Sequence, residues 1–315
     1  MFTKVLVTGG LGFLGRAVAR RFKAQGCEVV GLGHGSCPPE SARILGYDTW
    51  VEGDVTQDML AALPGPFDVV VHCAANSSVA YSLDHPLEAF RSTVQNTAEL
   101  LEYLRRTSPA ALLLYPSSAA VYGAADDRPL EETDEPNPIS PYGFYRQMTE
   151  DLLASYARCH GVRSAAVRFF SIYGPGLRKQ LLWDAAGKLM AGQPEATFWG
   201  TGGETRDWIH VDDAASLLVH LSTSKDSHLV VNGASGERVT VAKVLSMLRT
   251  ALGVDVTFAF NDETKPGDPR FYHADVSRLR ALGWQPSVPL HQGLAIYAQW
   301  VKHARAPAPS APGHS

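Results

Sequence analysis

The 315-residue sequence contains no apolar stretch close to the roughly 20 residues that a membrane-spanning helix needs. It also lacks a long basic run. The 28 Lys and Arg and the 32 Asp and Glu give a formal net charge of -4. Neutralising a phosphate backbone requires clustered cations, so neither nucleic acid nor a membrane is an expected partner. Residues Met1 to Lys4 lead directly into a strand-like run, so we expect no signal peptide and a cytoplasmic location.

Cysteine is scarce, and the few cysteines are far apart. The four are Cys27, Cys37, Cys73 and Cys159, and they show neither the spacing of metal ligands nor a disulfide framework. The eleven histidines are equally scattered. We therefore expect reduced thiols and no metal site.

Short apolar runs alternate with helical patterns through the first half of the chain. The expected strands are Lys4 to Val7, Glu28 to Leu32, Tyr47 to Glu52, Phe67 to His72, Ala111 to Tyr115 and Val162 to Phe169. The expected helices are Arg16 to Ala24, about Leu87 to Arg106, and about Pro141 to His160. This alternation is typical of right-handed βαβ units, so the sequence predicts an α/β fold: a Rossmann-type, doubly wound parallel sheet.

The alternation ends at about Gly174. Later helical patterns, mixed with short strands and loops, cover Leu181 to Met190, Val211 to Ser222, Val241 to Leu252 and Leu290 to His303. We expect residues 1–173 to form the first domain, joined by chain that crosses back at about 206–232. Residues 174–303 would form mainly a smaller mixed α/β subdomain, and 304–315, rich in Pro, Ala and Ser, a mobile tail.

The segment Gly9-Gly-Leu-Gly12-Phe-Leu-Gly15 follows the first strand and opens the first helix. In this setting Gly9 allows a tight turn, Gly12 allows the backbone to approach a pyrophosphate, and Gly15 allows close packing of helix on sheet. The N–H groups at the helix start, including those of Phe13 and Leu14, then face the phosphates. The sequence predicts a dinucleotide site, the alternative being a merely structural turn.

The end of the second strand discriminates between the two nicotinamide cofactors. An acidic residue there normally binds the ribose 2′-hydroxyl of NAD, but this chain has Gly33-His34-Gly35-Ser36. His34, Ser36 and Arg43 offer partners for a 2′-phosphate instead. The cofactor is therefore expected to be NADP or NAD, with NADP favoured.

Tyr142 and Arg146 stand four residues apart near the start of a predicted helix, behind Ser140 as N-cap and Pro141 at the first helical position. Residues at this spacing share a helix face, and a nearby cation favours the phenolate form of a tyrosine. Ser118, at the end of the fifth strand, is placed to bond the same substrate hydroxyl. The alternative is a surface tyrosine beside a solvated arginine.

Other segments accompany these motifs: Val71 to Ala75, Ser117 to Gly123, Arg168 to Pro175, Arg206 to Asp213 and Leu282 to Pro286. Their order, over about residues 3 to 302, resembles that of the extended short-chain dehydrogenase/reductases, specifically the NAD-dependent epimerase/dehydratase family, which includes UDP-galactose 4-epimerase. The resemblance implies a nucleotide-diphosphate sugar as substrate, residues 174–303 as its main binding subdomain, and a homodimer.

The resemblance also implies roles for individual residues. Tyr142 would be the general base and acid, with Ser118 as its partner. Further cofactor-binding residues would be Asp54, Val55, Cys73, Ala74, Ala75, Thr93, Arg146 and Phe170. Further substrate-binding residues would be Ser117, Ser171, Arg178, Arg206, Lys265 and Asp268. The neighbouring cations Arg178 and Lys179 suit a contact with a substrate phosphate and a solvated helix start equally well.

The chain departs from the family pattern in three places. Arg146 stands where the family has lysine, and its planar guanidinium reaches differently from an ammonium. Ala119 and Ala120 replace the Asp-Glu pair of sugar 4,6-dehydratases, which removes the acid and base that dehydration needs. Ser171 and Lys265 replace the usual asparagine and arginine, which leaves the sugar and the nucleotide open.

The hypothesis that follows is an epimerase that transiently oxidises a sugar carbon, with C4 favoured, and in which Tyr142 accepts the hydroxyl proton. An NADP-dependent ketoreductase or sugar dehydrogenase is the main alternative. A 4,6-dehydratase and a non-catalytic dinucleotide-binding protein remain open as further alternatives.

Overall fold

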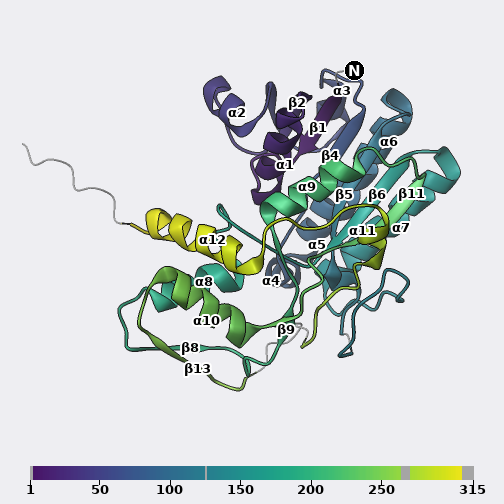
Figure 1. Cartoon of the computed structure of the whole chain (residues 1–315). Coiled ribbons are helices and arrows are strands. Elements are labelled where there is room, and N and C mark those ends of the chain that lie inside the picture. Colours follow the sequence, from purple (N-terminus) through teal and green to yellow (C-terminus); the bar gives the residue numbers. More distant parts are fainter. Residues whose placement is uncertain (1–2, 125, 264–269, 307–315) are drawn as a thin grey trace, which may run out of the picture.

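The computed structural model describes residues 3–124, 126–263 and 270–306. Within these residues a seven-stranded parallel sheet has the order β11-β6-β5-β4-β1-β2-β3 (Figure 1). The strands are β1 Lys4–Thr8, β2 Glu28–Gly33, β3 Thr49–Glu52, β4 Val69–His72, β5 Leu112–Ser118, β6 Arg163–Phe169 and β11 His228–Gly233. The expected Rossmann-type α/β fold is confirmed. The strand order reverses between β1 and β4, where doubly wound sheets bind ligands.

The central strands are apolar on both faces. In β1, Val5 and Val7 pack into the core on one side of the sheet, whereas Leu6 packs into the core on the other side. Successive side chains of a strand point to opposite faces, so a strand covered on both sides reads as a continuous apolar run.

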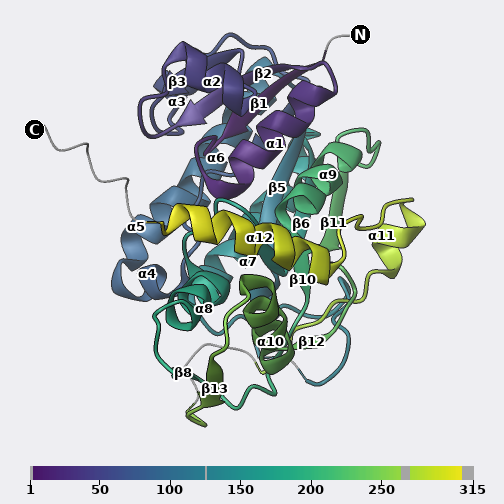
Figure 2. The ribbon, with the colours of Figure 1, turned by 60° about the vertical axis from the view of Figure 1, so that its left-hand side comes forward.

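Helices cover both faces of the sheet. One face carries α1 Phe13–Ala24, α2 Pro39–Leu45, α9 Val211–Leu221 and α11 Ser277–Ala281. The other face carries α3 Gln57–Ala61, α6 Asn96–Thr107 and α7 Pro141–His160. Figure 2 shows α1 and α9 side by side in front of the strands.

A second core lies in the C-terminal part of the chain. It is formed by α8 Gln180–Leu189, α10 Val241–Leu252 and α12 Leu290–Ala304, which pack together below the main sheet (Figures 1 and 2). Three two-stranded sheets border it: β7 Ser171–Tyr173 with β10 Trp208–His210, β9 Thr205–Arg206 with β12 Val239–Thr240, and β8 Glu195–Phe198 with β13 Thr257–Phe260. Between β10 and β12 the chain returns to the main sheet through α9 and β11, and β11 extends that sheet beside β6.

The expected helix over residues 87–106 is interrupted. It consists of α5 Pro86–Phe90, the π-helical turn η1 Arg91–Gln95, and α6. A π-turn inserts an extra residue into a helix and is frequent at functional sites. Thr93, an expected cofactor residue, lies in this turn and is buried.

Four short helices were not expected from the sequence: α2, α3, α4 Val79–Asp84 and α11. Helices of five to seven residues depend on tertiary packing more than on their own periodicity. Ala304 of the expected tail ends α12, whereas residues 307–315 lie outside the described residues. No helix in the described part of the chain has the length and apolar character to cross a bilayer.

Candidate active site

The turn between β1 and α1 has no room for side chains. Gly9 has φ 64°, and a Cβ there would lie 2.6 Å from the backbone nitrogen of Ala74. A Cβ on Gly12 or Gly15 would lie 2.9 or 2.5 Å from the Gly9 carbonyl oxygen. Gly9 therefore lets the β1–α1 turn lie directly against the segment that follows β4, and Gly12 and Gly15 let the start of α1 lie directly against the turn.

The N-terminus of α1 has the polarity that a diphosphate requires. Gly12 is its N-cap and supplies no capping side chain, and the first turn contains no acidic residue. Phe13 and Leu14 begin the helix, so their N–H groups are among those left without an intrahelical acceptor. Unpaired N–H groups and the positive end of the helix dipole form an anion site, which fits the pyrophosphate of a dinucleotide.

The segment after β4 forms the opposite wall. Cys73 N–H donates to the Thr8 carbonyl at 3.1 Å, and Ala74 N–H donates to Thr8 Oγ1 at 3.3 Å. Ala75 follows, partly buried. Thr8 Oγ1 also bonds His72 Nδ1 at 2.7 Å, and burial lowers the pKa of His72 to about 3, with Arg146 adding to the effect. A neutral His72 therefore holds the wall in place, which is a structural role.

Most of the residues expected at the adenosine end are exposed, and Val55 is the exception. His34 Nε2 lies 2.8 Å from Asp54 Oδ1, and Val55 beside it is buried in the core. Gly35, with φ 92°, accepts a hydrogen bond from Trp50 Nε1 at 3.1 Å. Ser36 is exposed, and so is Arg43 on α2. A carboxylate is thus present near this end, although it comes from the end of β3 and not of β2.

The helix that carries the expected base begins as the sequence indicates. Ser140 caps α7 by accepting a hydrogen bond from Gly143 N–H at 3.2 Å, and Pro141 is the first helical residue. A Cβ on Gly143 would lie 2.6 Å from the Ala120 carbonyl oxygen, so α7 packs closely on the 3₁₀ turn η2 Ala119–Val121. Tyr142, half-buried, is thereby brought to the turn that follows Ser118.

Arg146 is buried, with 5% of its surface exposed. Its Nη1 donates to the Tyr115 hydroxyl at 2.8 Å and to the Pro116 carbonyl at 3.0 Å, and its Nη2 donates to the Asn76 carbonyl at 2.8 Å. The guanidinium carbon lies 5.0 Å from the centre of the Tyr142 ring. Burial disfavours the charge, but Tyr115 and Tyr142 outweigh it and raise the pKa of Arg146. The cation beside Tyr142 is therefore permanent.

Arg146 Nε is buried and has no partner among the described residues. An unpaired buried N–H costs free energy unless a ligand satisfies it. A hydroxyl of a nicotinamide ribose is a suitable acceptor. The glycine turn and the start of α1 could therefore bind the pyrophosphate of a nicotinamide dinucleotide, and Arg146 Nε could bind its ribose.

The two serines at the end of β5 point in different directions. Ser118 is half-buried, and its Oγ accepts a hydrogen bond from Ala120 N–H at 3.2 Å. Ser117 is buried and donates to Glu150 Oε1 at 2.5 Å, beside the Arg168–Glu150 ion pair at 2.8 Å. Ser118 therefore lies at the η2 turn on which α7 packs, whereas Ser117 is directed to Glu150, because adjacent residues of a strand face opposite sides.

Three of the remaining expected residues, Phe170, Ser171 and Arg206, lie in or next to the short strands β7 and β9. Phe170 packs edge-to-face on Tyr272, with 6.0 Å between ring centres, and the Arg206 guanidinium lies 6.0 Å from the same ring. Ser171 is half-buried at the start of β7. Lys265 and Asp268 lie outside the described residues.

The adjacent cations Arg178 and Lys179 diverge. Arg178 lies over the Trp300 ring of α12, with 5.8 Å to the ring centre, so the structure does not place it beside Tyr142. Lys179 Nζ donates to Ser77 Oγ at 2.5 Å, at the wall that follows β4. Ser77 and Asn76 were not among the expected site residues, whereas Lys179 shared with Arg178 the two alternatives of a substrate-phosphate contact and a solvated helix start.

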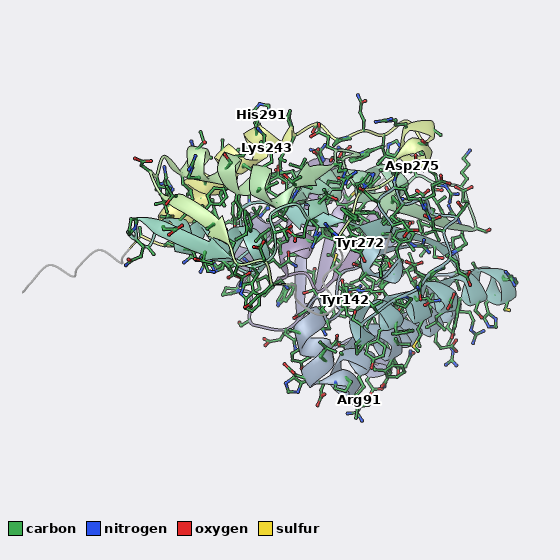
Figure 3. The ribbon with its side chains drawn as sticks, turned by 90° about the horizontal axis from the view of Figure 1, so that it is seen from below. Arg91, Tyr142, Lys243, Tyr272, Asp275 and His291 are labelled. Carbon is green, nitrogen blue, oxygen red and sulfur yellow. The ribbon has the colours of Figure 1, made fainter. Side chains whose placement is uncertain are left out.

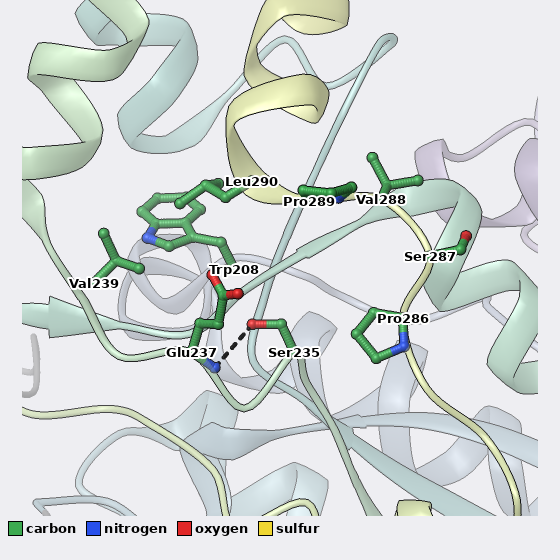
Figure 4. A pocket seen from close by; sticks show the side chains of 9 residues that line it. All are labelled: Trp208, Ser235, Glu237, Val239, Pro286, Ser287, Val288, Pro289 and Leu290. Carbon is green, nitrogen blue, oxygen red and sulfur yellow. Dashed lines mark hydrogen bonds between the residues drawn. The ribbon is translucent and has the colours of Figure 1, made fainter.

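A separate cavity of about 150 Å³ lies beside β10, where Trp208 faces Val239 and Leu290 (Figure 4). Its lining includes none of the expected catalytic or cofactor residues. Within the described chain, no group of three or more His, Cys, Asp or Glu side chains has the arrangement of a metal site.

Comparisons with known proteins agree with this geometry. Residues 5–233 match the model of the NAD dependent epimerase/dehydratase family. The UDP-glucose 4-epimerase of Azospirillum brasilense is 31% identical over 90% of this chain and 87% of its own.

Two solved structures share the fold over almost the whole chain. The UDP-glucose 4-epimerase of Thermotoga maritima with UDP-glucose is 26% identical, with a TM-score of 0.87 over 96% of this chain and 99% of that one. The UDP-glucuronic acid 4-epimerase of Bacillus cereus, in complex with UDP-glucuronic acid and NAD, is 25% identical, with a TM-score of 0.85 over the same shares.

Proposed function

The chain belongs to the NAD-dependent epimerase/dehydratase family and is a nucleotide-sugar epimerase that uses an NAD-type cofactor, and we propose that it inverts C4 of a UDP-linked hexose or hexuronate. The observation that carries the proposal is the juxtaposition of Tyr142, the buried Arg146 and the Ser118 turn at the carboxyl edge of the sheet. The UDP group and the position C4 come from the relatives, which act on UDP-glucose and UDP-glucuronate.

The chemistry divides between the cofactor and the chain. The glycine turn, the start of α1 and Arg146 would hold a nicotinamide dinucleotide, which would supply a hydride acceptor and donor for the sugar carbon. Tyr142, as phenolate, takes the proton of the C4 hydroxyl and gives it back to the carbonyl oxygen after the sugar has turned. Ser118 bonds the same oxygen, and Arg146 keeps a positive charge beside the phenolate in both half-reactions.

The same site is poorly equipped for dehydration. Eliminating water from a ketosugar requires an acid and a base beyond the tyrosine, and η2 offers only Ala119, which is buried, and Ala120. Contacts to the nucleotide, to which Arg206 would contribute, hold the ketosugar while it turns, so remote binding energy positions the reacting carbon.

The choice between NADP and NAD stays a prediction. His34 and Ser36 are exposed, and both could meet a 2′-phosphate. The Asp54 carboxylate beside His34 would repel that phosphate and suits a ribose hydroxyl. Mass spectrometry of the nucleotide released from the denatured protein decides between them.

We also propose a homodimer. Exposed apolar side chains gather on α4, α5 and α7: Leu83, Leu87, Phe90, Phe144 and Met148. α5 and α7 pack together, with the Phe90 and Tyr145 rings 5.6 Å apart, so these residues form one face. An apolar face of this kind suits a second copy of the chain. Leu87→Glu with Met148→Glu should give a monomer in light scattering.

The cytoplasmic location stays a prediction.

The purified protein, incubated with UDP-glucose, UDP-glucuronate and UDP-N-acetylglucosamine in turn, should convert at least one into its C4 epimer, as followed by NMR. No net change in the absorbance of reduced nicotinamide should accompany turnover. A steady rise or fall of that absorbance would instead support the ketoreductase or dehydrogenase alternative. Tyr142→Phe is the control, because it retains the ring and its packing but has no proton to move.

A further inference from the structure

The first N–H groups of a helix have no acceptor within that helix. In α7 the first helical residue is Pro141, which has no N–H, and the third is Gly143, which donates to the capping Ser140 Oγ at 3.2 Å. The second helical residue is Tyr142. Its N–H therefore needs an acceptor from another part of the chain.

Ser82 of α4 supplies that acceptor. Tyr142 N–H donates to Ser82 Oγ at 3.1 Å, and the Ser82 hydroxyl donates its own proton to the Val79 carbonyl at 2.7 Å. The bond to Val79 fixes the direction of the hydroxyl proton and leaves a lone pair for the Tyr142 N–H. Ser82 has 0% of its surface exposed, so water does not compete for this oxygen.

A second connection joins α4 to α7 one helical turn further on. Arg146 Nη2 donates to the Asn76 carbonyl at 2.8 Å, and Asn76 Oδ1 accepts a hydrogen bond from Ser78 N–H at 3.0 Å. Ser78 is the N-cap of α4 and accepts a hydrogen bond from Tyr81 N–H at 3.2 Å. Hydrogen bonds therefore lead from α7 to α4 both at Tyr142 and at Arg146.

The packing of the helices supports these two connections. α4 contacts both α5 and α7, and α5 contacts α7. Figure 3 shows Tyr142 and Arg91, the residue that begins the π-turn after α5, on the same side of the molecule. With six residues, α4 is too short to be stable by itself, so its position depends on these contacts. The position of α4 and that of the Tyr142 main chain are thus fixed together.

We propose that Ser82 is a positioning residue for the epimerase reaction: its hydroxyl holds the main chain of Tyr142, and thereby the phenol, where the sugar hydroxyl loses its proton. The proposal rests on the proposed function. A displacement of about 1 Å at a reacting group can lower a rate about 10²-fold, so a bond to this one N–H matters for turnover. Because the bond acts on Tyr142, its loss should affect kcat and not the binding of the nucleotide sugar.

The first test measures the bond directly and needs no substrate. In protein that contains tyrosine labelled with a nitrogen isotope, the amide signal of Tyr142 is the one that is missing from Tyr142→Phe. In Ser82→Ala this N–H should exchange with deuterium at least about tenfold faster than in the wild type, because it has lost its acceptor.

Ser108→Ala is the matched control. Ser108 is buried, and its Oγ accepts a hydrogen bond from Phe67 N–H at the same distance, 3.1 Å. The two residues directly precede β5 and β4, so they lie at the edge of the sheet where these strands begin, opposite the edge that carries Ser118. Ser108→Ala should leave the exchange of the Tyr142 amide unchanged.

The second test separates positioning from stability. Ser82→Ala and Ser108→Ala should both lower the melting temperature, because each leaves a backbone N–H without its acceptor. Only Ser82→Ala should reduce kcat, by about ten- to a hundredfold, with the KM for the nucleotide sugar and the cofactor content unchanged. Ser82→Cys keeps a side chain of similar shape but offers a weaker acceptor, so it should show the faster exchange and the lower kcat to a lesser degree, and it replaces Ser82→Ala should that variant not fold.

Either an unchanged exchange rate or an unchanged kcat in the folded Ser82 variants would overturn the proposal. Equal losses of kcat in Ser82→Ala and Ser108→Ala would do so too, since the loss would then follow from stability. A wild type that epimerises no nucleotide sugar would refute the proposed function, and the exchange of the Tyr142 amide would still decide whether Ser82 holds its main chain.

Discussion

Arg146→Lys tests whether the guanidinium holds β5 to the segment that follows β4. Arg146 makes three hydrogen bonds to buried acceptors. A hydrogen bond from a charged donor contributes roughly 1.5–3 kcal/mol to stability, and an acceptor left unpaired costs a similar amount. A lysine retains the charge but loses one or two of these bonds, so the free energy of unfolding should fall by about 2–4 kcal/mol.

Urea unfolding followed by tryptophan fluorescence measures this change, provided that the slope with denaturant stays constant. Arg21→Lys is the control, because Arg21 lies on the exposed side of α1, and its effect should stay within about 0.5 kcal/mol. If Arg146→Lys is as stable as the wild type, the three bonds do not hold β5 to the loop after β4. If it is also more active at neutral pH, the guanidinium is merely a poor substitute for lysine.

Other predictions follow from single contacts. Gly15→Ala places a Cβ 2.5 Å from the Gly9 carbonyl oxygen, so the protein should fold but release its dinucleotide, as calorimetric titration with NAD will show. Ser118→Ala should lower kcat, whereas Ser117→Ala should lower the melting temperature and leave kcat nearly unchanged, because of the two serines it is Ser117 that bonds buried Glu150. In the unfolded chain His72 takes up a proton near pH 6.5, whereas burial lowers its folded pKa to about 3. As the pH is lowered from 6.5 to 3, His72 should therefore lower the free energy of unfolding by up to about 1.4 kcal/mol per pH unit. His72→Gln should remove that slope.

Local sequence signals placed much of the site. The bounds of α7 agree with those expected, because Ser140 and Pro141 start the helix and Gly161, with φ 69°, ends it. The glycine turn was equally readable, since strand, glycines and helix are contiguous. The bounds of α7 and the glycine turn are set by residues that lie next to one another in the chain, so the sequence alone indicates them.

Features that depend on tertiary packing were not readable. Ser117 and Ser118 are adjacent in sequence, and only the position of β5 between its two neighbouring strands decides which one is directed to Glu150 and which one lies at the η2 turn. Lys179 stands 102 positions after Ser77 and meets it only through the loop before α8. The sequence presented Arg178 and Lys179 as equivalent cations, whereas the structure directs one to Trp300 and the other to Ser77.

The most direct test of the account is turnover of UDP-glucose that carries deuterium at C4. Because the hydride leaves that carbon and returns within the same site, the product should be the C4 epimer with its deuterium retained, and Tyr142→Phe should reduce the rate by about 10²–10⁴-fold. A product that carries a solvent proton at C4, or full turnover by Tyr142→Phe, would contradict transient oxidation with Tyr142 as the proton acceptor.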